Sequence, residues 1–198
     1  MKKDDRRVKY TKMVLRDSLV KLLSEKDISR ISIKEICESA DVNRATFYAH
    51  YADQYDLLEK VENELLENIR SYLSGHENDG LPRSDTEWSV TVDMVTKIFD
   101  YLKENASLCK LMLTDKRNMD FQKRFMTLVY DPYFLRMANE GVYDREEMAY
   151  VYSFTLMGFV GAVQTWLDNG MNQSSRAFAE LLVRLFVRVS GGTEKVRM

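Results

Sequence analysis

Apolar positions recur at helical spacing along most of the chain. In residues 9–25, Leu15, Leu19, Leu22 and Leu23 follow the i, i+4, i+7, i+8 pattern of an amphipathic helix with one apolar face. Further helices are expected at about 33–40, 44–50, 54–66, 87–105, 107–114, 118–138, 144–169 and 174–190. Asn139–Gly141 and Asn169–Gly170 are expected to end two of them. No useful period-two alternation occurs, and only two prolines and eight glycines interrupt 198 residues. The pattern predicts an all-α protein.

Two of these helices are short and have clear start and stop signals. Ser32 and Glu35 stand three residues apart and form a capping box at the start of the first helix. Asp41 follows that helix and tolerates the left-handed backbone of a tight turn. Asn43 can then cap the second helix. Helix, tight turn and helix in this order are typical of a DNA-binding helix-turn-helix.

The second short helix divides its side chains between two faces. At about 100° per residue, Phe47 and Tyr51 share one face and are expected to pack on the preceding helix. Ala45, Thr46 and Ala49 fall on the opposite face, where a DNA groove would lie. The ring-rich stretch 42–51 therefore combines anchoring residues with recognition residues.

The distribution of charge and a linker-like stretch divide the chain into two parts. Residues 1–16 hold seven basic residues against Asp4 and Asp5, although the whole chain has a net charge of -2. A basic N-terminal segment on a mildly acidic body favours a polyanion at that end. We expect a DNA-binding domain at 1–53 and a helical regulatory and dimerisation domain at 54–198. The clearest linker-like stretch is 74–86.

Other classes of function have little support in the residues. The two cysteines are far apart, only two histidines are present, and no CxxC, GxGxxG, Walker A, HExxH or GxSxG motif occurs. We therefore expect no catalytic residues, no metal, no cofactor and no disulfide, and we expect a cytoplasmic protein that is not an enzyme. Residues 149–167 carry no charge over 19 positions, which approaches a membrane span. The polar residues within this stretch favour a helix covered by protein instead.

The segment 33–58, "IKEICESADVNRATFYAHYADQYDLL", resembles the DNA-binding domain of the TetR family of bacterial regulators. The first helix, which starts near Tyr10-Thr11, also fits the family, so the likeness covers about 60 residues. The rest of the chain matches only in size and helical plan. The residues that match the family pattern are Ile36, Cys37, Ala40, Val42, Thr46, Phe47, Tyr48, His50, Tyr51, Leu57 and Leu58.

The resemblance implies specific DNA contacts. Arginine can bind guanine O6 and N7 with two hydrogen bonds, and an alanine methyl can touch a thymine methyl. Phosphate contacts fix the position of the protein without reading sequence. The residues expected to contact DNA are Ser32, Lys34, Asn43, Arg44, Ala45, Thr46, Tyr48 and His50. Of these, the resemblance implies that Arg44, Ala45 and Tyr48 read bases and that Ser32, Thr46 and His50 hold phosphates, while Lys34 could reach either.

Two positions differ from the family pattern. Asp41 stands where the family has a turn glycine, and it places a negative charge near the DNA-facing surface. Gln54 replaces a lysine that usually contacts phosphate from the fourth helix. The loss of one ionic contact should make the salt dependence of DNA binding shallower by about one unit. The basic segment 1–16 can compensate for this loss.

The C-terminal part is expected to provide a dimer interface and a ligand pocket. The last two helices of each family member pair with those of a second subunit, and small residues allow close approach. The interface residues expected are Gly158, Gly161, Ala162, Leu181 and Leu185. The pocket residues expected are Trp88, Tyr101, Met112, Phe121, Phe125, Phe154 and Trp166. Since aromatic and methionine stripes are mostly core, a purely structural role for these residues stays open.

The resemblance implies a dimeric repressor that binds a near-palindromic operator in double-stranded DNA and is released by a small-molecule inducer. No membrane partner is expected. The pattern Gly158, Gly161, Trp166-Leu167, Asn169-Gly170 is similar to a region of regulators found near dihydroxyacetone kinase genes. That likeness implies an alternative, in which a protein co-regulator replaces the small ligand. An adaptor that kept the helix-turn-helix only as a scaffold is a further alternative.

Overall fold

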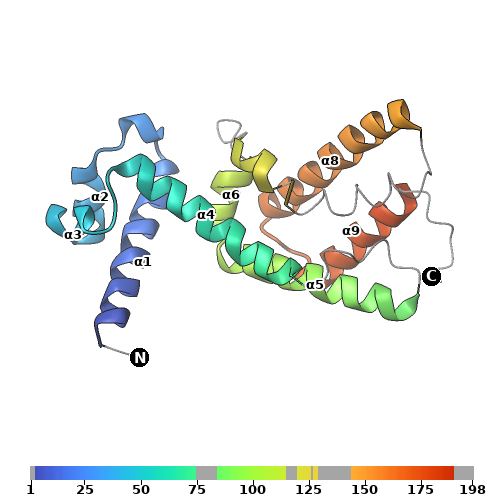
Figure 1. The fold of residues 1–198 in the computed structure, drawn as a ribbon, viewed down its shortest axis with the longest axis horizontal. Helices are drawn as coiled ribbons and strands as arrows, with labels where there is room; N and C mark the ends of the chain where they lie inside the picture. The colour runs from blue at the N-terminus through green and yellow to red at the C-terminus, as the bar shows by residue number, and fades with distance from the viewer. Residues whose placement is uncertain (1–2, 75–83, 115–119, 126, 129–143, 190–198) are drawn as a thin grey trace. The chain divides into compact units, whose positions relative to one another are not determined.

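The structure is a computed structural model that describes residues 3–74, 84–114, 120–125, 127–128 and 144–189 (Figure 1). The described elements are α1 (Lys3–Leu23), a 3-10 turn (Ile28–Arg30), α2 (Ile33–Ala40), α3 (Arg44–Tyr48), α4 (Gln54–Leu73), α5 (Asp85–Glu104), α6 (Ala106–Thr114), α8 (Arg145–Asp168) and α9 (Ser175–Val189). No strand occurs within these ranges. The prediction of an all-α protein is confirmed.

The chain forms two compact units, Met1–Leu65 and Leu66–Met198. The division falls inside α4, later than the boundary at residues 53 and 54 expected from the sequence. The first half of α4 belongs to the N-terminal unit, because its apolar face completes the core of that unit. Leu57 and Val61 on this face are 0% and 5% exposed.

The N-terminal unit has a small core to which each of its helices contributes. α1 packs against α2, and α2 packs against α3. Leu15, Leu19, Ile36, Phe47 and Leu57 are all fully buried. Burial of one such side chain contributes about 1.5–3 kcal/mol, so five of them decide the stability of a unit of this size. The core holds the short α3 in place.

The C-terminal unit is built on contacts of α5 with α9 and of α6 with α8. Phe99, Trp166 and Phe178 form an aromatic cluster between α5, α8 and α9. The rings of Trp166 and Phe178 are stacked with centroids 4.9 Å apart, and Phe99 lies 4.8 Å from Phe178. The indole Nε1–H of Trp166 donates to the carbonyl of Gln173 at 3.2 Å. The hydrogen bond and the stacking fix this ring as part of the core.

Several helix ends match the expected signals. α8 ends at Asp168 with Asn169 as its C-cap, and Gly170 follows with a positive φ of 69°. The second expected stop, Asn139–Gly141, and most of the helix expected at 118–138 lie outside the described residues, although 120–125 are helical. Among the described helices, α8 included, none has the length and apolar character needed to cross a membrane.

Candidate nucleic-acid interface

The N-terminus of α2 is held by the capping box expected from the sequence. The Ser32 hydroxyl accepts from the Glu35 backbone N–H at 3.3 Å, and the Glu35 carboxylate accepts from the Ser32 N–H at 2.9 Å. Lys26 also donates to Glu35. The hydrogen bond from Lys26, followed by those from Ser32, lowers the pKa of Glu35 from 4.5 to about 2. Glu35 therefore stays ionised when it holds the helix.

Glu35 makes the N-terminal unit sensitive to acid. Its folded-state pKa is lowered, so its contribution to stability is present above about pH 4.5 and is lost as the pH falls towards 2. Glu35→Gln keeps a capping acceptor but loses the charge. We expect the variant to melt below the wild type at pH 7, and the difference in Tm to shrink between pH 4.5 and 2.5. A constant difference across that range would contradict this role of the charge.

The turn between α2 and α3 has a left-handed residue where the sequence predicted one. Asp41 has φ 52° and ψ 45°, and its backbone N–H closes the end of α2. The next N–H, that of Val42, donates to the carbonyl of Cys37 at 3.0 Å. Asp41 is exposed and places a negative charge at the C-terminal end of a helix, where the helix dipole disfavours it. The turn therefore carries two unfavourable contributions: the left-handed backbone of a non-glycine residue, and a negative charge at the C-terminal end of α2.

Asp41→Gly should remove both the backbone strain and the unfavourable charge. Glycine adopts positive φ without a steric penalty, and the gain is partly offset by the greater entropy of the unfolded chain. We expect the free energy of unfolding to rise by about 0.5–1 kcal/mol. Binding to DNA at low salt should tighten as well, because a negative charge is removed near the phosphates. Asp41→Asn is the control: it should tighten DNA binding with a smaller gain in stability. No change in DNA affinity with either variant would place Asp41 away from DNA.

α3 begins at a well-formed cap. Asn43 Oδ1 accepts from the Thr46 backbone N–H at 2.7 Å and from the Thr46 hydroxyl at 2.9 Å. Arg44 and Ala45 follow in the first turn, and both are exposed. Their exposure next to a capped helix start is suited to contact with base edges.

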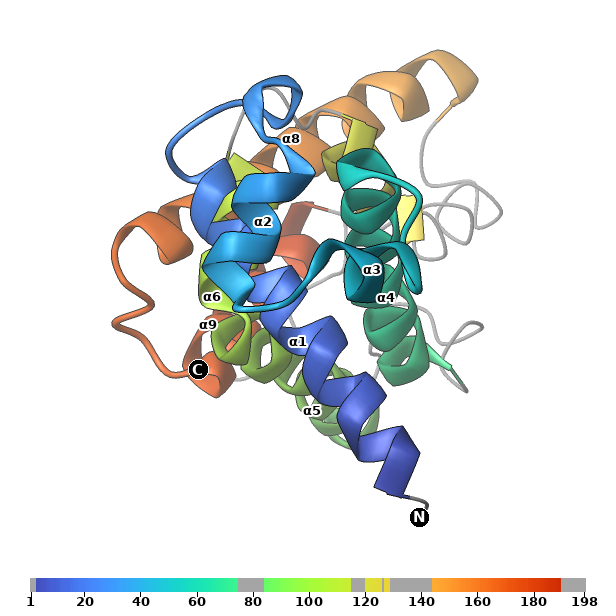
Figure 2. The ribbon, with the colours of Figure 1, turned by 90° about the vertical axis from the view of Figure 1, so that its left-hand side faces the viewer.

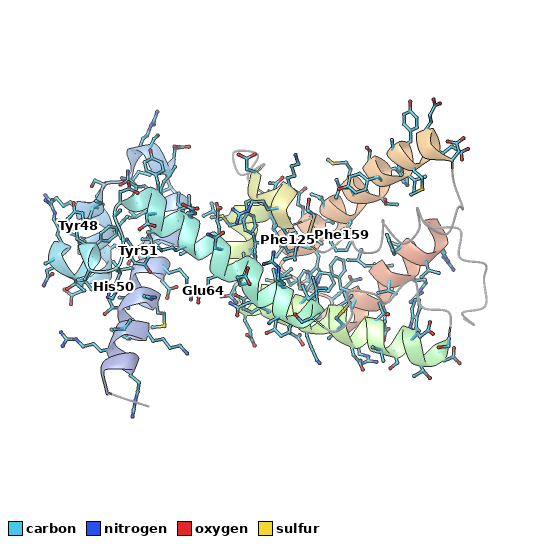
Figure 3. All side chains as sticks on the ribbon, in the orientation of Figure 1. Tyr48, His50, Tyr51, Glu64, Phe125 and Phe159 are labelled. Carbon is cyan, nitrogen blue, oxygen red and sulfur yellow. The ribbon has the colours of Figure 1, made fainter. Side chains whose placement is uncertain are left out.

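The rings of this segment divide as the helical wheel predicted. Phe47 is 0% and Tyr51 6% exposed, whereas Tyr48 is 57% exposed. The centroids of Phe47 and Tyr51 lie 5.7 Å apart. Figure 3 shows Tyr48 at the outer side of α3 and Tyr51 on the side towards α4. Figure 2, which faces the N-terminal unit, shows α3 at the near surface beside α2. Tyr48 is therefore free to contact DNA, and the other two rings anchor the helix.

The hydroxyl groups expected to hold phosphates are already engaged within the chain. The Ser32 hydroxyl donates to Glu35 at 2.8 Å, and the Thr46 hydroxyl donates to Asn43. Each hydroxyl has one proton to donate, so a phosphate contact would require that bond to break. Lys34 is exposed and pairs with Glu38 at 3.6 Å, which is a weak surface pair that phosphate can replace.

Residues of α4 that the sequence did not single out fasten the end of α3. Lys60 Nζ donates to the His50 carbonyl at 3.1 Å and to Asp56 at 2.9 Å, and it lies 5.2 Å from the centre of the Tyr51 ring. Asp56 also accepts from the Ala52 N–H at 2.8 Å, and this bond, followed by that of Lys60, lowers its pKa. The i, i+4 spacing of Asp56 and Lys60 was a visible signal, but the bond to His50 was not.

The residues expected to line a ligand pocket lie in different surroundings. Met112, Phe121 and Phe125 are buried, at 1%, 2% and 2% exposure. Tyr101 accepts a hydrogen bond from Asn68 at 2.9 Å, and Trp88 is half-buried on α5.

Phe154 does not have the buried position expected of a pocket residue, because its side chain is 70% exposed. Trp166 is packed in the aromatic cluster. The sequence could not separate the buried Trp166 from the exposed Phe154, because the same apolar residue types occur on a helix face in the core and on a helix face that binds a partner.

Phe154 belongs to an exposed apolar stripe on α8. Tyr150 and Met157, which share its helix face, are 78% and 65% exposed. A Cβ added at Gly158 or Gly161 would meet nothing within 4 Å. Three further residues expected at a dimer interface are partly or largely exposed: Ala162, Leu181 and Leu185.

The described residues contain few other groups that could bind a metal or react chemically. They contain no group of three or more histidine, cysteine or carboxylate side chains that could hold a metal. Cys37 and Cys109 are both buried and free. Burial raises the pKa of both thiols, that of Cys109 to about 12.

Family comparison matches the chain in two places. Residues 15–61 match the model described as bacterial regulatory proteins, TetR family. Residues 91–188 match the model described as a transcriptional regulator C-terminal region. The uncharacterised HTH-type transcriptional regulator YxbF of Bacillus subtilis (strain 168) is 35% identical over 55 residues, which are 28% of this chain and 14% of that protein. The match thus spans only a small part of that relative.

Solved structures share the fold. A putative TetR-family regulator from Syntrophomonas wolfei has a TM-score of 0.64 at 16% identity, with 96% of this chain and 99% of that chain covered. The dihydroxyacetone kinase operon activator DhaS has a TM-score of 0.55 at 17% identity, with coverage of 90% and 94%. FadR from Bacillus subtilis, in complex with stearoyl-CoA, has a TM-score of 0.61 at 14% identity, with coverage of 92% and 99%.

The exposed start of α3, its buried anchor, and the two matched models agree with the resemblance read from residues 33–58. The chain therefore belongs to the TetR family of DNA-binding transcriptional regulators.

Proposed function

We propose that two copies of this chain bind a near-palindromic DNA site through α3 and repress transcription until an inducer binds the C-terminal unit. The observation that carries the proposal is the arrangement of α3. Phe47 is fully buried, while Arg44 and Ala45 are exposed in the first turn. A helix anchored on one side and exposed at its start is suited to the major groove.

The apolar stripe on α8 supports the dimer. Three large side chains on one helix face, each more than 60% exposed, are unusual on a monomer surface. The open space at Gly158 and Gly161 allows a second helix to approach closely. A two-fold dimer presents two copies of α3 about one helical turn of DNA apart, so the site should be near-palindromic.

An inducer of apolar character is supported by the buried methionine and aromatic residues of the C-terminal unit. FadR of Bacillus subtilis, which shares the fold, holds stearoyl-CoA. Met112, Phe121 and Phe125 are the residues we propose nearest such a ligand, because they are buried and methionine adapts to varied shapes. A protein co-regulator remains the second possibility for the signal. The likeness to DhaS, an operon activator, makes activation the second possibility for the outcome.

A mobility-shift experiment tests the proposal. The purified chain is mixed with duplexes from the region upstream of its own gene, at several salt concentrations and against random-sequence competitor. We expect a sequence-selective shift that weakens with salt. The absence of any selective shift would overturn the proposed function. Release by a small molecule favours the inducer, whereas release only by a second purified protein favours the co-regulator. A reporter gene distinguishes repression from activation.

Arg44→Ala should relax sequence specificity. If Arg44 binds a guanine with two hydrogen bonds, its loss costs about 1–3 kcal/mol, or roughly 5- to 150-fold in affinity for the selected site. Binding to random duplex should fall by only a few fold, since one positive charge is lost. Lys34→Ala is the control, because a phosphate contact should weaken binding to both duplexes alike. An equal loss on both duplexes with Arg44→Ala would remove this residue from the base-reading set.

A further inference from the structure

The N-terminal unit contains a basic groove. Most of its basic residues belong to the basic segment 1–16, but nothing in the sequence indicated the groove itself. It lies between α1, the end of α3 and α4, all within residues 9–64, and its volume is about 750 Å³. We call it the α1 groove. Its basic residues are Lys9, Lys12, Arg16 and Lys60, and the rings of Tyr10, His50 and Tyr51 also line it. The volume is many times that of one water molecule, so the groove has room for a phosphate group and its hydration.

The charge of the groove is concentrated on one wall. Lys9, Lys12 and Arg16 stand at i, i+3 and i+7 of α1, and so lie along one face of the helix. Arg16 is paired with Asp17 at 3.1 Å, and Lys60 with Asp56. No ion pair of Lys9 or Lys12 occurs among the described residues, and both side chains are exposed. These two ammonium groups are available to an anion.

The opposite wall of the groove is formed by the residues that directly follow α3. Ala49 and His50 line the groove directly after α3, and Lys60 holds the His50 carbonyl in place. Glu64 is the single carboxylate of the lining, and Figure 3 shows it on α4 farther from α3 than His50. An anion is therefore attracted to the part of the groove nearest α3 and repelled from the part near Glu64.

We propose that the α1 groove binds the phosphate backbone of DNA beside the major groove that α3 enters, with Lys9 and Lys12 as its main contacts. The proposal rests on the proposed function, because it takes DNA as the ligand. It also explains how the chain tolerates three weakened phosphate contacts. Gln54 carries no charge, and the hydroxyls of Ser32 and Thr46 are engaged within the chain. Two lysines on α1 supply the missing charge.

The test is the salt dependence of binding to two 30-base-pair duplexes, one from the region upstream of the gene and one of random sequence. Each phosphate contact contributes about 0.9 to the slope of log affinity against log salt. The double variant Lys9→Ala/Lys12→Ala should lose about two units of slope on both duplexes. The control Lys21→Ala/Lys103→Ala removes the same charge from exposed positions outside the groove lining, and its slope should stay near that of the wild type.

Lysine labelling of the full wild-type chain gives a readout that does not depend on a variant. With an amine-reactive reagent, random duplex should protect Lys9 and Lys12 but not Lys21. An unchanged slope in the groove variant, or an equal loss in the control, overturns the proposal while leaving DNA binding intact. Protection of both lysines by millimolar AMP, but not by duplex, would assign the groove to a small anion and overturn it too. If the wild type binds neither duplex, the proposed function itself has failed.

Discussion

Phe47→Ala is expected to unfold the N-terminal unit and abolish DNA binding, while the C-terminal unit stays folded. Removing a fully buried phenylalanine costs about 3–5 kcal/mol, which combines lost burial with the cavity left behind. A 65-residue unit is stable by about 3–10 kcal/mol in total. The loss is therefore comparable with the whole stability of the unit. α3 has only five residues and cannot form without this anchor.

The two cysteines allow each unit to be followed separately. Cys37 is 4% exposed in the N-terminal unit, and Cys109 is 0% exposed in the C-terminal unit. Both thiols are protected in the native chain, because burial limits access and raises the pKa of each thiol. In Phe47→Ala, a thiol reagent should label Cys37 quickly and Cys109 slowly, as measured by peptide mass. Equal labelling of both would show that the units unfold together.

Tyr48→Ala is the matched control for the loss of a ring. Tyr48 is the neighbouring residue of the same helix, but it is 57% exposed and contributes little to the core. We expect this variant to keep Cys37 protected and to melt close to the wild type. It should weaken DNA binding, since the ring lies on the face that we propose contacts DNA. Unfolding by Tyr48→Ala would contradict the division of the rings between anchor and recognition surface.

The sequence predicted best those features that depend on residues close together in the chain. The capping box of Ser32 and Glu35, the left-handed Asp41 and the Asn43 cap each involve residues within three or four positions. The burial of Phe47 and Tyr51 followed from helical periodicity alone. Such local rules hold because backbone hydrogen bonds at helix ends must be satisfied wherever the helix lies.

Features that bring distant residues together could not be predicted in the same way. The α1 groove unites Lys9 and Lys12 with His50 and Lys60, and only the packing of α1 beside α3 and α4 makes them neighbours. Phe154 was expected in a pocket because it is an apolar residue on a charge-poor helix. The sequence does not tell whether such a residue is covered by its own chain or by another molecule. Its 70% exposure is a tertiary result. The engaged hydroxyls of Ser32 and Thr46 also required the structure, because their donor directions depend on rotamers.

Phe154→Asp should dissociate the proposed dimer. Phe154 lies in the middle of the exposed stripe between Tyr150 and Met157, so in a dimer its ring would be buried against the second copy. A carboxylate there would have to be buried without a partner, which is strongly unfavourable. Because the position is exposed within one chain, the variant should fold normally. Light scattering should show a mass near 23.2 kDa for the variant and about twice that value for the wild type.

The same variant should bind the selected duplex far more weakly. Two linked α3 helices bind two half-sites with a high effective concentration for the second contact, and a monomer loses this advantage. We expect a loss of about 100-fold or more in affinity for the palindromic site, and little change on a single half-site. Val90→Asp is the control, because Val90 is 41% exposed on α5 and lies outside the stripe. It should remain dimeric and bind normally. If Phe154→Asp stays dimeric, the subunits must meet elsewhere, and the stripe must serve a different partner.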